Sequence, residues 1–201
     1  MILHIWGFFR TFVEIFLDFM KKVTYNGLIF KPFISSQQIA QRIEEIAADI
    51  TRKYSGRNPL IVCVLNGAFP FAADLFRALD CDAEIAFVRL SSYAGTESTG
   101  EVRQVVGLTD PVEGRPVIVV EDIIDTGRTM EKFLADLRRM NPSDVEVATL
   151  LFKPESLKAD IKPDYVGFTI PPAFIIGFGL DLDGKARNLK DIYVLDDEAN
   201  A

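Results

Sequence analysis

The chain has 201 residues, which is enough for one domain with a sizeable core but too few for two full domains. Hydrophobic residues make up 49% and charged residues 25% of the sequence, a typical globular composition. The net charge of −7 argues against broad, non-specific binding of nucleic acid. The only histidine is His4, so the rest of the chain cannot form a Ser-His-Asp triad or a zinc site that uses histidine.

Two cysteines are too few for a disulfide framework. Cys63 lies in an apolar run and Cys81 in an acidic loop. We expect both to be inert thiols of a protein in the reducing cytoplasm.

Residues 1–20 form an apolar and aromatic segment that we expect to be separate from the functional domain, residues 21–201. Arg10, Glu14 and Asp18 recur every four residues and would form one polar stripe on a helix. These charges and the short length argue against a transmembrane span, and the segment lacks the basic start and cleavage site of a signal peptide. We expect a dispensable extension; a surface-binding or oligomerising helix is the alternative.

From residue 21 onward, helical and extended patterns alternate. Short apolar runs predict strands at 60–65, 84–90, 117–120, 145–152, 165–170 and 192–195. Apolar residues at helical spacing predict helices at 36–54, at 69–79 and from about 126. Residues 91–100 are rich in Ser, Thr and Gly, which predicts a mobile loop. The alternation is typical of an α/β fold with a doubly wound, mostly parallel sheet.

The most informative stretch is 117–129, Val-Ile-Val-Val-Glu-Asp-Ile-Ile-Asp-Thr-Gly-Arg-Thr. Its four leading apolar residues do not alternate with polar ones, so we expect a strand that is covered on both faces. A helix that begins near Thr126 would offer free N–H groups and the positive end of its dipole, which suit a phosphate. Gly127 permits close backbone approach, and Thr126 and Thr129 can add hydroxyl donors.

Three carboxylates, Glu121, Asp122 and Asp125, lie beside this predicted anion site. They would repel a phosphate, so we expect them to face sugar hydroxyls, a metal or a proton in transit on the same ligand. Asp and Thr are also ordinary helix N-caps, and Asp-Thr-Gly-x-Thr by itself would favour a purely structural role.

The whole stretch resembles the phosphoribosyl-pyrophosphate (PRPP) motif of the phosphoribosyltransferases. The resemblance extends over nearly all of 25–195 and is closest to the 6-oxopurine branch of the type I family, the hypoxanthine and hypoxanthine-guanine enzymes. Four further blocks match in order: Leu-Asn-Gly-Ala at 65–68, Ser-Ser-Tyr at 91–93, Lys-Pro at 153–154, and 174–181 with Arg187. The resemblance implies the type I fold, with a small hood subdomain and a flexible catalytic lid.

The resemblance also implies a role for each block. Glu121 and Asp122 would meet the ribose hydroxyls, and Asp125 would be the general base for the purine. Ser92 and Tyr93 would begin the lid, which excludes water when it closes. The residues implied to bind the 5′-phosphate are Asp125, Thr126, Gly127, Arg128 and Thr129, and those implied to bind pyrophosphate are Asn66, Gly67 and Arg187.

The purine would be bound by four residues, Lys153, Phe174, Ile175 and Asp181. By resemblance, Lys153 donates to a 6-oxo group, which adenine lacks, so the site should reject adenine. The Phe174 ring would stack on the base and the Ile175 backbone would read its edge. Asp181 would hold Mg²⁺, directly or through water, with Glu121 and Asp122 as further candidate ligands.

Asn66 departs from the family pattern, because relatives commonly have Lys or Arg there to contact pyrophosphate. We expect weaker PRPP binding, with Mg²⁺ and Arg187 carrying more of the charge. The family's non-proline cis peptide, if kept at Leu65-Asn66, would still direct backbone N–H groups at the ligand.

These observations predict a purine salvage enzyme that converts PRPP and hypoxanthine or guanine into IMP or GMP and pyrophosphate. We expect only small-molecule partners, no nucleic acid or membrane, and a homodimer or homotetramer as in relatives. A regulator with the same fold would need a DNA-binding domain or a basic face, which this acidic chain does not show. A phosphoacceptor signalling receiver ranks last, because its acidic pair lies near the amino terminus and Lys153 follows the strand at 145–152 here.

Overall fold

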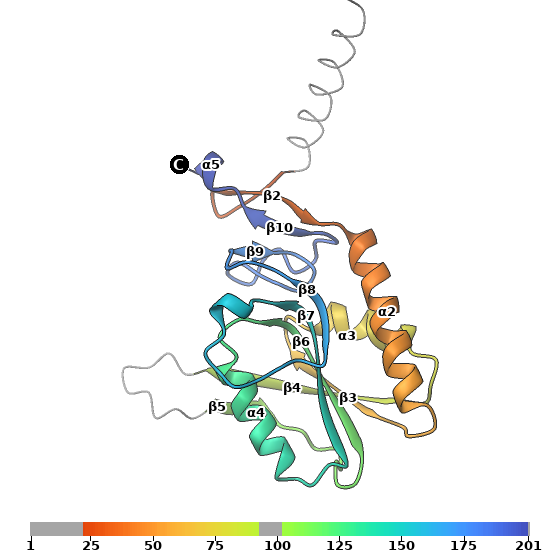
Figure 1. The fold of residues 1–201 in the computed structure, drawn as a ribbon. Coiled ribbons are helices and arrows are strands. Elements are labelled where there is room, and N and C mark those ends of the chain that lie inside the picture. The colour runs from red at the N-terminus through yellow and green to blue at the C-terminus, as the bar shows by residue number, and fades with distance from the viewer. Residues whose placement is uncertain (1–21, 93–101, 201) are drawn as a thin grey trace, which may run out of the picture. The chain divides into compact units, whose positions relative to one another are not determined.

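A computed structural model describes residues 22–92 and 102–200, with side chains omitted at 91–92 and 102–106 (Figure 1). The expectations for residues 1–20 and for Tyr93 lie outside these residues. Two compact units divide the chain: Gln37–Pro172 forms the larger, and parts of Met1–Ser36 and Ala173–Ala201 form the smaller. Within the described residues, no helix has the length and apolar character needed to cross a membrane.

The larger unit is built on a six-stranded sheet with the order β5-β4-β3-β6-β7-β8. Neighbouring strands are parallel except β5, which pairs antiparallel with β4. The strands are β3 (Leu60–Leu65), β4 (Glu84–Ser92), β5 (Val102–Val106), β6 (Pro116–Ile124), β7 (Asp144–Phe152) and β8 (Tyr165–Thr169). The prediction of a doubly wound, mostly parallel sheet is therefore confirmed.

Three helices and a short 3₁₀ turn cover this sheet, with α4 on one side and α2 and α3 on the other (Figure 1). The apolar side of α4 packs on valines of β3, β4 and β6 in one buried cluster. Because helices cover both faces, the first five residues of β3 and of β6 are buried, which explains why these apolar runs do not alternate. The helices are α2 (Ser36–Tyr54), α3 (Phe69–Ala78) and α4 (Arg128–Arg138), and the 3₁₀ turn is η1 (Pro154–Ser156).

The smaller unit is a four-stranded antiparallel sheet with the order β1-β2-β10-β9. Its fully buried side chains include Phe30, Ile176 and Ile192. Only the last of its strands was predicted; the others are short or contain a proline. The elements are β1 (Val23–Tyr25), β2 (Leu28–Ile34), β9 (Ile175–Ile176), β10 (Ile192–Leu195) and the short helix α5 (Asp197–Asn200).

The PRPP-type stretch differs from prediction at both ends of its turn. Strand β6 continues to Ile124, so Glu121 and Asp122 lie inside the strand and not after it. Helix α4 begins at Arg128, two residues later than predicted, because Gly127 takes the N-cap position in the left-handed region (φ 76°). No side chain caps this helix, so the alternative role of Asp125 or Thr126 as an N-cap is wrong.

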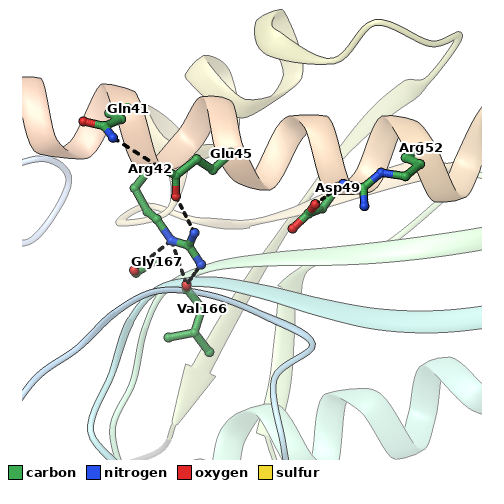
Figure 2. Close-up of polar contacts among 7 residues, drawn as sticks. All are labelled: Gln41, Arg42, Glu45, Asp49, Arg52, Val166 and Gly167. Atoms are coloured by element: carbon green, nitrogen blue, oxygen red, sulfur yellow. Dashed lines mark hydrogen bonds and ion pairs between the residues drawn. The ribbon is translucent and has the colours of Figure 1, made fainter.

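Arg42 of α2 covers backbone carbonyls of the edge strand β8 (Figure 2). Its Nε donates to Val166 O (3.2 Å) and Gly167 O (3.1 Å), and its Nη2 donates to Val166 O (2.8 Å). Its Nη1 also pairs with Glu45 at 2.6 Å. An edge strand has backbone N–H and C=O groups that could pair with a strand of another molecule. The guanidinium of Arg42 bonds to two of these carbonyls, and it also attaches α2 to β8.

We predict that Arg42→Met, which keeps the apolar stem and removes the donors, lowers the free energy of unfolding by about 1–2 kcal/mol. Arg52→Met is the matched control, because Arg52 pairs only with Asp49 on the same helix and is 75% exposed (Figure 2). Its effect should stay within about 0.5 kcal/mol. Urea unfolding measures both, and equal losses would contradict the role of the carbonyl contacts.

Candidate active site

The register of β6 and β7 brings Asp125 and Lys153 together. The last paired residues are Ile124 and Phe152, so Asp125 and Lys153 leave the sheet side by side at its carboxyl edge. The Lys153 N–H donates to Ile124 O at 3.0 Å, and its Nζ donates to Asp125 Oδ2 at 3.0 Å. Lys153 is 8% exposed, so a cation is held almost buried beside an acid. Both residues were predicted for this site, but their ion pair was not.

Glu121 and Asp122 lie on β6 just before this edge. Asp122 Oδ1 accepts from the Ile123 N–H at 2.8 Å, and Glu121 Oε1 accepts from the Asp122 N–H at 3.2 Å. Burial, and then the neighbouring Asp122 carboxylate, raise the pKa of Glu121 well above its ordinary value. Two acids held this close favour a ligand that adds positive charge or hydrogen-bond donors.

The same carboxylates are oxygen donors of the kind that Mg²⁺ prefers. Over the described part of the chain, no three His, Cys, Asp or Glu side chains are grouped so that they could hold a metal ion. Glu121 and Asp122 therefore fit Mg²⁺ only as part of a coordination sphere, which a substrate and water would complete.

The turn after β3 approaches Asp122 closely. Its Leu65-Asn66 peptide is cis, as the family resemblance led us to expect, and the Asn66 side chain is exposed. Gly67 is buried, and a Cβ there would lie 1.5 Å from Asp122 Oδ2. The carboxylate thus fills the space that a side chain at position 67 would need, which explains the glycine.

Residues 125–129, the predicted phosphate site and hereafter the phosphate loop, run from the end of β6 into α4. Gly127 is buried at its centre, while Thr126 and Arg128 are exposed and Thr129 is half-buried. The first N–H groups of a helix have no acceptor within it, so this loop offers donors to an anion. The expected helix N-terminus is present, and its start is set by Gly127.

Cys63 of β3 pairs with Val120 of β6, one residue before Glu121. Burial, together with the Glu121 and Asp122 charges, raises the pKa of the Cys63 thiol to about 12. The thiol is therefore protonated and unreactive at neutral pH, as predicted.

Four other candidate residues belong to the smaller unit: Phe174, Ile175, Asp181 and Arg187. Arg187 Nη2 pairs with Asp181 Oδ1 at 2.5 Å, and its Nη1 donates to Gly179 O at 2.6 Å. Asp181 Oδ2 accepts from the Gly184 N–H at 2.7 Å. The candidate metal ligand and the candidate pyrophosphate ligand thus already contact each other, which was not predicted.

Phe174 and Ile175 lie at the start of the same segment. Phe174 is 46% exposed, unusual for a phenylalanine, and its ring centroid lies 6.0 Å from that of the buried Phe30. Ile175 is buried in β9. Ser92 ends β4, but its side chain and all of Tyr93 lie outside the described residues.

We predict that Gly67→Ala displaces the Asp122 carboxylate and lowers kcat/KM for PRPP by about 100-fold, because errors of about 1 Å in an active site have this effect. Gly114→Ala is the control: its φ is +70° and nothing lies within 4 Å of the new methyl. That variant should lose about 1 kcal/mol of stability and keep its activity. Similar activity losses in both would mean that the Asp122 contact is not the cause.

Residues 34–183 match the family described as the phosphoribosyl transferase domain. The hypoxanthine-guanine phosphoribosyltransferase of Lactococcus lactis subsp. lactis (strain IL1403) is 44% identical over 180 residues, which cover 89% of this chain and 98% of that protein. The enzyme of the same name from Bacillus subtilis (strain 168) is 42% identical over 168 residues, covering 83% of this chain and 93% of that protein.

Solved structures agree with these relatives. A hypoxanthine-guanine phosphoribosyltransferase from Bacillus anthracis superposes with a TM-score of 0.78 and 40% identity, covering 82% of this chain and 98% of that one. A hypoxanthine phosphoribosyltransferase from Staphylococcus aureus gives a TM-score of 0.80 at 36% identity, covering 85% of this chain and 93% of that one.

Proposed function

Since the chain belongs to the phosphoribosyl transferase domain family, we propose that it is a purine salvage enzyme. It transfers the 5-phosphoribosyl group of PRPP to hypoxanthine and guanine, and the products are IMP or GMP and pyrophosphate. The partners are these small molecules, the enzyme is cytoplasmic, and it acts as a homodimer or homotetramer.

The ion pair of Asp125 and Lys153 carries this proposal. Its acid and cation lie 3.0 Å apart, and Asp125 is the first residue of the phosphate loop. A purine next to the loop would present one edge to this pair, so that its imidazole N–H meets the proton acceptor and its 6-oxo group meets the donor. The Lys153 ammonium has three donors, so it can serve the oxo group and keep its bond to Asp125. Adenine presents an amino group there, and two donors would face each other.

In the reaction, the attacking purine nitrogen forms a bond to the anomeric carbon of PRPP while the bond to pyrophosphate breaks. Asp125 takes the proton from the imidazole ring of the purine. Positive charge develops on the ribose ring, and the nearby Glu121 and Asp122 carboxylates stabilise it. The phosphate loop holds the 5′-phosphate, so the reacting atoms stay in line.

Mg²⁺ is the proposed cofactor. In the larger unit its candidate ligands are Glu121 and Asp122, and in the smaller unit the candidate is Asp181. When bound, it would offset the charge of the departing pyrophosphate. Within the smaller unit, Arg187 has a fork of donors that suits a phosphate group, and Phe174 has an exposed ring that suits stacking on a base.

The test is nucleotide formation from PRPP and Mg²⁺ with hypoxanthine, guanine, xanthine or adenine offered separately. We expect turnover with hypoxanthine and guanine and none with adenine. Asp125→Asn should lower kcat by about 100-fold or more, because it removes the general base. Asp136→Asn on α4, which only releases the exposed Arg139 just after that helix, is the control. Turnover with adenine, or full activity in Asp125→Asn, would overturn the assignment.

Asn66→Lys tests the departure at the turn after β3. The side chain at position 66 is exposed, so a lysine there would be free to attract the pyrophosphate group of PRPP. We expect the KM for PRPP to fall about two- to fivefold, and by less at high salt. Gln41→Lys adds the same charge to the exposed face of α2 and should have no effect. An equal change in both variants would indicate a general charge effect and not a contact with PRPP.

A further inference from the structure

The segment between η1 and β8 packs directly against the phosphate loop. We refer to residues 157–161 as the support segment. Its Lys158 N–H donates to Thr126 O at 3.0 Å. A Cβ built on Gly127 would lie 2.9 Å from the terminal methyls of both Leu157 and Ile161. The support segment therefore contacts the loop at two neighbouring residues.

Glu131 connects the support segment to the first turn of α4. Its Oε1 accepts from the Asp160 N–H at 3.0 Å, and its own N–H donates to Gly127 O at 2.9 Å. Leu157 and Ile161 also pack against the buried cluster of the larger unit. The support segment is thus anchored in the core on one side and by a carboxylate on the other.

A loop centred on a glycine needs outside constraints to keep one conformation. Gly127 has a left-handed φ of 76°, and glycine has access to more backbone conformations than any other residue. The bond to Thr126 O and the methyls against Gly127 limit those conformations. A loop that is already ordered binds its ligand without a further entropic cost.

We propose that the support segment, fastened by Glu131, is a positioning element that holds the phosphate loop ready for the 5′-phosphate of PRPP. This inference rests on the proposed function and extends it to residues that do not touch the substrate. If the segment is loosened, only a fraction of molecules have a competent loop, and the apparent Kd rises by the inverse of that fraction. Saturating PRPP selects the competent state, so kcat stays unchanged.

The test compares Glu131→Met, which removes the acceptor, with Glu131→Gln, which keeps an oxygen acceptor and loses the charge. Glu44→Met on the exposed face of α2 is the control. Loss of one hydrogen bond should raise the KM for PRPP and the Kd for ribose 5-phosphate about three- to tenfold in Glu131→Met. Glu131→Gln should remain near the unmodified protein. The kcat and the Kd for pyrophosphate should not change in either.

Leu157→Ala is a second, independent variant, and it should shift the same two constants in the same direction. Equal effects in Glu131→Met and Glu131→Gln would overturn the proposal, because they would point to charge at the helix start. A parallel loss of pyrophosphate binding or of kcat would also overturn it. If the unmodified protein neither binds ribose 5-phosphate nor forms nucleotide, the proposed function itself fails; normal constants in Glu131→Met and Leu157→Ala would remove only the positioning role.

Discussion

The parallel pairing of β6 with β7 is the constraint on which the chemistry of the larger unit depends. One register runs from Pro116↔Asp144 to Ile124↔Phe152. A slip by one residue would exchange the two faces of β7 and move Lys153 away from Asp125. The apolar residues that fix this register extend along both strands up to Ile124 and Phe152, next to Asp125 and Lys153. Burial of valines and leucines in the core thus determines where an acid and a cation meet.

Glu146 and Glu121 lie on the neighbouring strands β7 and β6, and their surroundings differ in the way that a structural acid differs from a ligand-binding one. Burial alone would raise the pKa of Glu146 on β7, but hydrogen bonds from Lys53, Tyr165 and Tyr54 outweigh it and hold the pKa below its ordinary value. Glu121 on β6 is half-buried, and no donor outweighs the effect of its burial and of the neighbouring Asp122 carboxylate, so its pKa rises. The protein's own donors stabilise Glu146 as an anion. Glu121 has a perturbed pKa of the kind that is common where a ligand completes a site.

The sequence predicted long, strongly patterned elements well and long-range contacts poorly. Strand β3 and helix α2 have the predicted bounds, because an unbroken apolar run and a clear helical period determine them. The bond between Asp125 and Lys153 joins residues 28 positions apart, and it follows from a strand register that no local pattern reveals. The two-residue strand β9 exists only through pairing with β10. The cis peptide was expected from family resemblance and not from any physical signal in the turn.

The smaller unit draws its strands from both ends of the chain. Strand β2 pairs with β10 from Phe30↔Leu195 to Ile34↔Ile192, and Phe30 is fully buried in the finished unit. The ribosome releases β2 more than 150 residues before β10, at about 5–20 residues per second. The contiguous larger unit can fold in that interval, while the edge of β2 that pairs with β10 is still unpaired. The four residues of β10 therefore decide when the sheet of the smaller unit can close.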